Sequence, residues 1–156
     1  MNMYRKGRPC KCGSSGCLGR YVSAMGMVNT FKEKLLEGRT SIIQEWVNQD
    51  PEVIQAVMIS KAYDLEDPLA IEVMHETGTL LGYGLSNVIN MLNPELIIVG
   101  GGMAAAGDRL LNTVRETVSN HALKLSRSKC TIVQAELGNR AGTVGAASYA
   151  RSKMLG

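Results

Sequence analysis

The sequence is poor in aromatic residues, in proline and in long apolar runs. Phe, Trp and Tyr make up 4% of the 156 residues and there are 4 prolines, so a core must be built from aliphatic side chains and methionine. No run approaches the roughly 18 apolar residues of a membrane span, and no apolar signal segment follows Met1. With 45% apolar residues the chain is too hydrophobic for a disordered one. We therefore expect one globular, cytoplasmic domain with no membrane partner.

The formal net charge of +3 is small, and its excess is local. Four basic residues gather near the amino terminus: Arg5, Lys6, Arg8 and Lys11. No recognition helix or aromatic ladder accompanies them, as nucleic-acid binding would require. The pattern therefore favours a solvated basic turn over a nucleic-acid site.

Hydrophobic spacing predicts a loop over residues 1–19, a helical segment over 20–93 and a βαβα unit over 94–156. The helices are predicted at 21–38, 40–46, 50–63, 67–93, 108–123 and 143–154, and the strands at 95–99 and 130–135. This order predicts an α/β fold that is rich in helix and has a small mixed or parallel sheet. Two strands are few for an α/β domain, so we expect further strands before Met1 or in a partner that pairs with an open edge.

Four finer expectations concern packing and helix capping. Gly78 and Gly82 lie four residues apart, on one face of a helix, where the lack of side chains lets another backbone come close. The apolar run 95–99 is typical of a strand that is covered on both faces. Asp108 is expected to cap the helix that it precedes, and Asn87 and Asn90 are expected to hydrogen-bond backbone or cap a neighbour.

Three cysteines within eight residues predict a metal site: Cys10, Cys12 and Cys17. Gly13 and Gly16 permit the tight turns that bring the thiols together, and three soft ligands suit zinc. A closed structural site needs four ligands, and neither histidine of the chain has the flanking pattern of a ligand. The fourth ligand must come from elsewhere or be missing. A small zinc-dependent nucleic-acid module would also need a basic reading surface.

Four segments resemble the ROK family of repressors and sugar kinases. They are C-K-C-G-S-S-G-C-L at 10–18, N-P-E-L-I-I-V-G-G-G at 93–102, A-G-D at 106–108 and L-G-N-R-A-G-T-V-G-A-A at 137–147. The resemblance implies an actin-like, ribonuclease H-like ATPase fold, of which this chain is the carboxy-terminal lobe without the amino-terminal one. It also implies that a histidine joins the three cysteines on zinc. That histidine falls just before Met1, so we expect an incomplete site that binds zinc weakly.

The resemblance further assigns Gly100, Gly101 and Gly102 to the wall of an ATP site, which in the full-length family also holds Mg²⁺. Two other interpretations remain open: a purely structural turn, and a loose dinucleotide fingerprint that lacks its acidic residue about 20 positions later. Gly19 stands where the family has a glutamate that binds sugar hydroxyls. Its loss removes a charge-assisted hydrogen bond of roughly 1.5–3 kcal/mol, unless Arg20 or the loop backbone compensates.

The family's phosphate loop, D-x-G-G-T, and its catalytic aspartate lie upstream of the zinc histidine, so no catalytic residue is assigned here. The resemblance implies the carboxy-terminal part of a hexose or N-acetylhexosamine kinase that is inactive alone. The alternative is the effector-sensing, dimerising lobe of a sugar-responsive repressor, which would contact DNA only through an absent amino-terminal domain. Whether the full-length protein is an enzyme therefore stays open, and the expected ligand is a sugar or sugar phosphate. Because an isolated lobe exposes apolar surface, we also expect a homo-oligomer.

Overall fold

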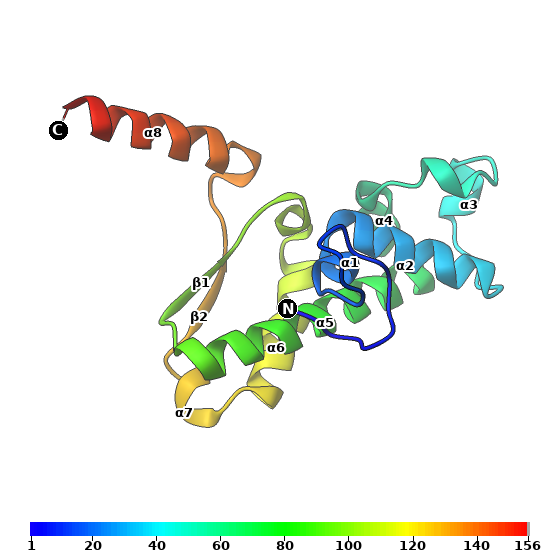
Figure 1. The fold of residues 1–156 in the computed structure, drawn as a ribbon. Coiled ribbons are helices and arrows are strands. Elements are labelled where there is room, and N and C mark those ends of the chain that lie inside the picture. The colour runs from blue at the N-terminus through cyan, green and yellow to red at the C-terminus, as the bar shows by residue number, and fades with distance from the viewer. Residues whose placement is uncertain (156) are drawn as a thin grey trace.

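The computed structural model describes residues 1–155, which form a helical body, a small sheet and a projecting last helix (Figure 1). The α-helices are α1 (Gly19–Val22), α2 (Ala24–Leu36), α3 (Ile43–Trp46), α4 (Ala56–Asp64), α5 (Pro68–Leu92), α6 (Asp108–His121), α7 (Lys124–Arg127) and α8 (Ala141–Leu155). The strands are β1 (Leu96–Val99) and β2 (Thr131–Gln134), and the 3₁₀ helices are η1 (Pro51–Val53), η2 (Gly102–Ala106) and η3 (Gly138–Arg140). Within residues 1–155, no helix combines the length and the apolar character needed to cross a membrane.

The two strands pair in parallel, with Leu96 opposite Thr131 and Val99 opposite Gln134. The predicted small parallel sheet in a helix-rich α/β fold is thus confirmed. The prediction that β1 is covered on both faces is wrong, because the Leu96 side chain is 51% exposed and that of Ile98 is 61% exposed. The described residues therefore leave this face of the strand largely exposed.

Helix α5 is the spine of the body and contacts α2, α4 and α6. It begins as predicted: the side chain of Asp67 accepts a hydrogen bond from the Ala70 amide at 2.8 Å, and Pro68 takes the first helical position. It ends at Asn93, which has a left-handed backbone with φ of 46° and precedes proline. Both ends are therefore set by local sequence. The apolar faces of these helices form the buried core.

Helices α5 and α6 pack closely, as the two glycines predict. A Cβ atom at Gly78 would lie 2.8 Å from Thr113 Cβ, and one at Gly82 would lie 2.5 Å from Thr117 Cβ. Side chains at these two positions would therefore hold the helices apart. The role predicted for Asn87 and Asn90 is confirmed for Asn90, because its Oδ1 accepts a hydrogen bond from the Leu123 amide at 2.8 Å. It is wrong for Asn87, which is exposed and whose side chain makes no hydrogen bond with the described residues.

Three predicted helix starts differ from the structure. The helix expected over 21–38 is two helices, α1 and α2, with a bend at Ser23, whose extended backbone and side-chain hydrogen bond to the Gly26 amide start α2 anew. The helix expected from Asp50 begins as the 3₁₀ turn η1, and extended residues separate it from α4. Asp108 is the first residue of α6 but its side chain caps no amide; it pairs instead with Arg115 Nη1 at 2.9 Å.

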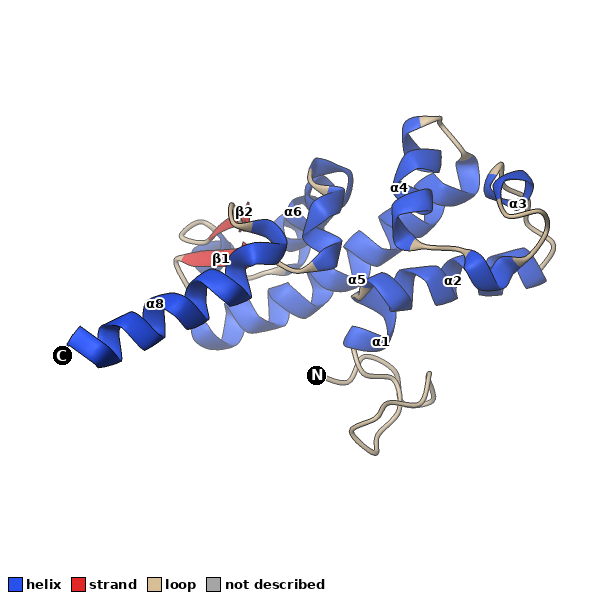
Figure 2. Cartoon of the chain, turned by 90° about the horizontal axis from the view of Figure 1, so that it is seen from above, coloured by secondary structure: helices blue, strands red, loops and turns tan. Residues whose placement is uncertain are grey.

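Helix α8 extends away from the helical body in both ribbon views (Figures 1 and 2). Residues 141–154 are all exposed. The strands and α8 therefore present apolar surface that the described residues leave uncovered, and the larger exposed side chains include Val144 and Tyr149.

Candidate functional site

Backbone hydrogen bonds fold residues 8–17 into a tight loop. The Gly16 amide donates to the Arg8 carbonyl at 2.9 Å, and the Cys10 amide donates to the Ser14 carbonyl at 2.9 Å. Gly13 and Gly16 have φ values of +88° and +71°, a conformation that side chains disfavour. The glycines that the sequence marked as turn residues therefore close the loop.

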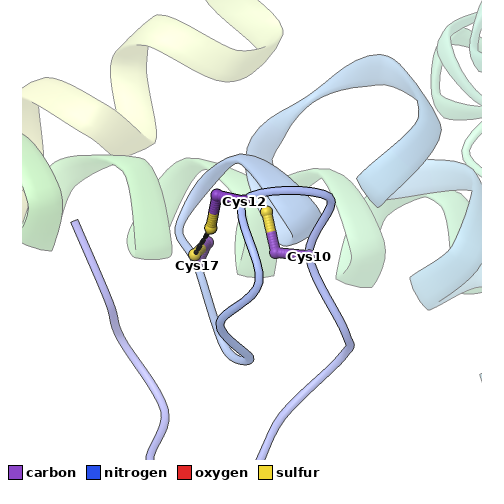
Figure 3. A group of neighbouring side chains, drawn as sticks. All are labelled: Cys10, Cys12 and Cys17. Carbon is purple, nitrogen blue, oxygen red and sulfur yellow. Dashed lines mark hydrogen bonds between the residues drawn. The ribbon is translucent and has the colours of Figure 1, made fainter.

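This loop brings the three predicted thiols together (Figure 3). The Sγ atoms of Cys10, Cys12 and Cys17 all lie within 4.8 Å of one another, and those of Cys12 and Cys17 are 3.5 Å apart. Zinc–sulfur bonds of about 2.3 Å in a tetrahedron place sulfur atoms about 3.8 Å apart. The thiols need to move by only about 1 Å to reach that geometry, so the donor set fits zinc. Among the described residues, no histidine, further cysteine or carboxylate joins this group as a fourth ligand.

The thiols of Cys12 and Cys17 do not ionise alike. A backbone hydrogen bond from Ser14, with smaller contributions from the neighbouring thiols, lowers the pKa of Cys12. Hydrogen bonding to Cys12, followed by that to Cys10, raises the pKa of Cys17 to about 11. Cys12 therefore loses its proton more readily than Cys17, and a metal ion must displace the proton that Cys17 keeps.

Gly19 begins α1 directly after the loop. It is exposed, and a Cβ atom built there would meet no other atom within 4 Å. The position has room for a longer side chain, so the structure itself does not require glycine there.

The glycine turn follows the carboxyl end of β1, where parallel α/β sheets commonly bind ligands. Gly101 has φ of +83°, and Cβ atoms at Gly101 and Gly102 would meet nothing within 4 Å, so this backbone is open to a ligand. A cavity of about 240 Å³ adjoins the turn. Its walls come from α2, α4, η2 and α6 and include Ser60, Lys61, Asp64, Gly102, Met103, Ala106 and Arg109.

The cavity was not foreseen from the sequence. Two of its lining residues, Arg109 and Asp64, form a two-pronged ion pair in which both N···O distances are 2.6 Å. These two residues are 45 positions apart, so no local motif marks them. A Cβ atom at Gly100 would lie 3.5 Å from the Ala135 Cβ, which is an ordinary van der Waals contact, and Gly100 is exposed like Gly101 and Gly102.

A comparison with protein-family profiles matches the ROK family over residues 1–153. The chain belongs to the ROK family. Its relatives include both kinases and regulators. It is 35% identical over 140 residues to a glucokinase of Halalkalibacterium halodurans, and the aligned region covers 89% of this chain and 42% of that glucokinase. It is 30% identical over 149 residues to the DNA-binding transcriptional dual regulator NagC of Escherichia coli, covering 96% of this chain and 35% of the regulator.

Among solved structures, this ROK chain is similar to a ROK family glucokinase from Streptomyces griseus in complex with glucose and AMPPNP. The TM-score is 0.87 at 28% identity, and the match covers 97% of this chain and 50% of the glucokinase. The similarity confirms the predicted actin-like ATPase fold. The chain spans half or less of the length of these three relatives.

Proposed function

We propose that this chain is the carboxy-terminal lobe of a ROK sugar kinase-like protein, in which it supplies a zinc-binding loop and one wall of a nucleotide site. The observation that carries the proposal is the open glycine turn beside a cavity, on a fold shared with a glucokinase crystallised with glucose and AMPPNP. The proposed division is a cysteine loop over 1–19, a helical segment over 20–93 and a βαβα unit over 94–156.

In this proposal Cys10, Cys12 and Cys17 hold zinc, and the fourth position is filled by water or by a ligand outside this set. Bound zinc supplies a cross-link between the two sides of the loop, which fixes the segment that leads into α1. With three protein ligands, binding is weaker than at a closed four-ligand site. Because Gly19 comes two residues after Cys17, bound zinc would also fix the position of Gly19 relative to the loop.

The exposed amides of Gly101 and Gly102 would face a nucleotide, whose phosphates Mg²⁺ would help to neutralise. Phosphoryl transfer depends on positioning and electrostatics from both sides of the nucleotide. These 156 residues contain no D-x-G-G-T phosphate loop, so we propose that the chain alone does not phosphorylate sugar. ADP formation that depends on sugar, measured in a coupled assay on these residues, would refute this.

A second function is favoured by Gly19 and by the similarity to NagC. A lobe without the glutamate at this position would bind a sugar or sugar phosphate more weakly, or bind a different one. Such a lobe suits an effector sensor in a dimeric repressor whose DNA contacts lie in another domain. The exposed apolar face of β1 supports self-association in either case, and light scattering that shows only monomers would count against it.

Nucleotide titration tests the first proposal. A fluorescent ADP analogue should bind the wild-type chain, and Gly102→Val should weaken that binding at least tenfold because the isopropyl group occupies the open side of the turn. Gly142→Val is the matched control, since a Cβ atom at that exposed helical position also meets nothing within 4 Å. Equal binding by both variants would refute the nucleotide wall. Sugar binding in the absence of any nucleotide binding would favour the effector-sensing lobe.

A further inference from the structure

Arg8 carries a largely buried guanidinium group whose five N–H donors all have acceptors; its side chain is 12% exposed. The Nε and one Nη2 hydrogen bond go to the two carboxylate oxygens of Glu33, at 2.9 and 2.5 Å. Nη1 donates to the carbonyls of Arg20 at 2.9 Å and Gly26 at 3.0 Å, and Nη2 donates to the Thr30 hydroxyl at 2.9 Å. The guanidinium thus joins α1 to three successive turns of α2.

The backbone of Arg8 belongs to the cysteine loop. Its carbonyl accepts the Gly16 amide at 2.9 Å, and its own amide donates to the Tyr21 hydroxyl at 2.8 Å. The Tyr21 ring lies under the guanidinium, 4.6 Å from ring centroid to Cζ. One residue therefore binds the loop through its main chain and the bend between α1 and α2 through its side chain.

These contacts flank the proposed metal and sugar positions. Arg8 is two residues before Cys10, and Gly16 directly precedes Cys17. Arg20, whose carbonyl the guanidinium holds, directly follows Gly19. The basic cluster was expected to be a solvated turn, and for Arg8 that expectation is wrong.

We propose that Arg8 is a positioning residue that holds the cysteine loop against the α1–α2 bend, so that metal binding by the three thiols and the ordering of the segment around Gly19 are coupled. The inference rests on the proposed zinc site. Mutating a residue that orients metal ligands without touching the metal typically weakens metal affinity 10–100-fold. Coupling between two sites is reciprocal, so whatever orders the Gly19 segment also strengthens metal binding.

The shape of the guanidinium is essential to this role. Lysine offers three donors on a compact ammonium group and cannot reproduce a planar fork that meets two carbonyls, a hydroxyl and a carboxylate together. Arg8→Lys keeps the charge but loses most of these contacts. Glu33→Gln keeps the shape of the guanidinium's main partner and removes its charge, so it perturbs the site more gently.

The test compares zinc affinity, by competition with a chelator under reducing conditions, in the wild type, Arg8→Lys, Arg8→Ala and Glu33→Gln. Arg5→Ala is the control, because it removes an exposed positive charge from the same segment. Cobalt(II) absorption reports the thiolate geometry, and hydrogen exchange of the peptide 18–26 reports the segment. Circular dichroism checks that each variant is folded. If Arg8→Ala does not fold, Glu33→Gln and Arg8→Lys still test the role of Arg8.

We expect the Arg8 variants to bind zinc at least tenfold more weakly, with an altered cobalt spectrum, while Arg5→Ala stays within twofold of the wild type. Zinc should slow exchange in 18–26 in the wild type and much less in Arg8→Lys. Wild-type affinity and spectrum in folded Arg8→Lys, or an equal loss in Arg5→Ala, would overturn the role of Arg8 while leaving the zinc site standing. Absence of zinc binding by the wild type would instead overturn the zinc site, and this inference with it.

Discussion

Replacing Gly82 by alanine tests the close packing of α5 on α6. The added Cβ would lie 2.5 Å from Thr117 Cβ and 3.1 Å from the Val114 carbonyl oxygen. Thr117 is 7% exposed, and its hydroxyl donates to the Thr113 carbonyl at 2.8 Å, which fixes its rotamer. Neither neighbour can move aside without shifting α6, so the new methyl group must push the two helices apart.

Two opposing effects set the size of the change. Overpacking a close contact typically costs about 1–3 kcal/mol, and this one involves a β-branched side chain and backbone, so about 2–3 kcal/mol applies. Alanine gains about 1 kcal/mol over glycine in a helix interior. The free energy of unfolding should therefore fall by about 1–2 kcal/mol, and Tm by about 2–8 °C for a chain of this size.

Urea unfolding followed by circular dichroism measures this change. Gly145→Ala is the control, because it adds the same methyl group to an exposed helical position with no atom within 4 Å and so should not lower stability. A Gly82→Ala chain as stable as the Gly145→Ala chain would show that the helices do not approach as closely as described here.

Three further predictions concern charge, the loop and the sugar position. Hydrogen bonds from Lys34, then from Arg39, lower the pKa of Glu72 below its ordinary value of 4.5, so its stabilising contribution is present above that pH and is lost as the pH falls below it. Glu72→Gln should thus lower stability at pH 7 but narrow the gap to the wild type near pH 3, and parallel pH profiles in thermal melts would contradict this. Gly16→Ala should weaken zinc binding more than Gly13→Ala. Both glycines have positive φ, but only a Cβ atom at Gly16 would also collide with the backbone of Tyr4. Equal zinc affinities of the two variants in chelator competition would contradict this. Gly19→Glu should leave Tm within about 2 °C, because the position is open, and should strengthen sugar binding in calorimetry; unchanged affinity would separate this site from sugar.

Local signals in the sequence predicted much of the fold. Each end of α5 is marked by a short local signal: Asp67 followed by a proline at its start, and Asn93 followed by a proline at its end. The spacing of Gly78 and Gly82 predicted the face that packs on α6, and the cysteine spacing predicted which thiols lie together. Each of these features depends on neighbours in the sequence or on one helical period.

The features that the sequence did not predict depend on contacts that hydrophobic periodicity and composition do not reveal. The bend between α1 and α2 requires Gly26, where a Cβ would lie 2.6 Å from the Tyr21 backbone, and hydrophobic periodicity runs through the bend unchanged. Arg8 finds its acceptors 12 to 25 residues away, so its composition-based interpretation as solvated was wrong. The exposed face of β1 reflects which elements cover the strand, which an apolar run alone does not specify.

X-ray absorption at the zinc edge tests the central claim most directly. On the reduced chain loaded with one equivalent of zinc, we predict three sulfur neighbours at about 2.3 Å, contributed by Cys10, Cys12 and Cys17. A first coordination shell made only of nitrogen and oxygen, with all three thiols still free to alkylation, would contradict the account.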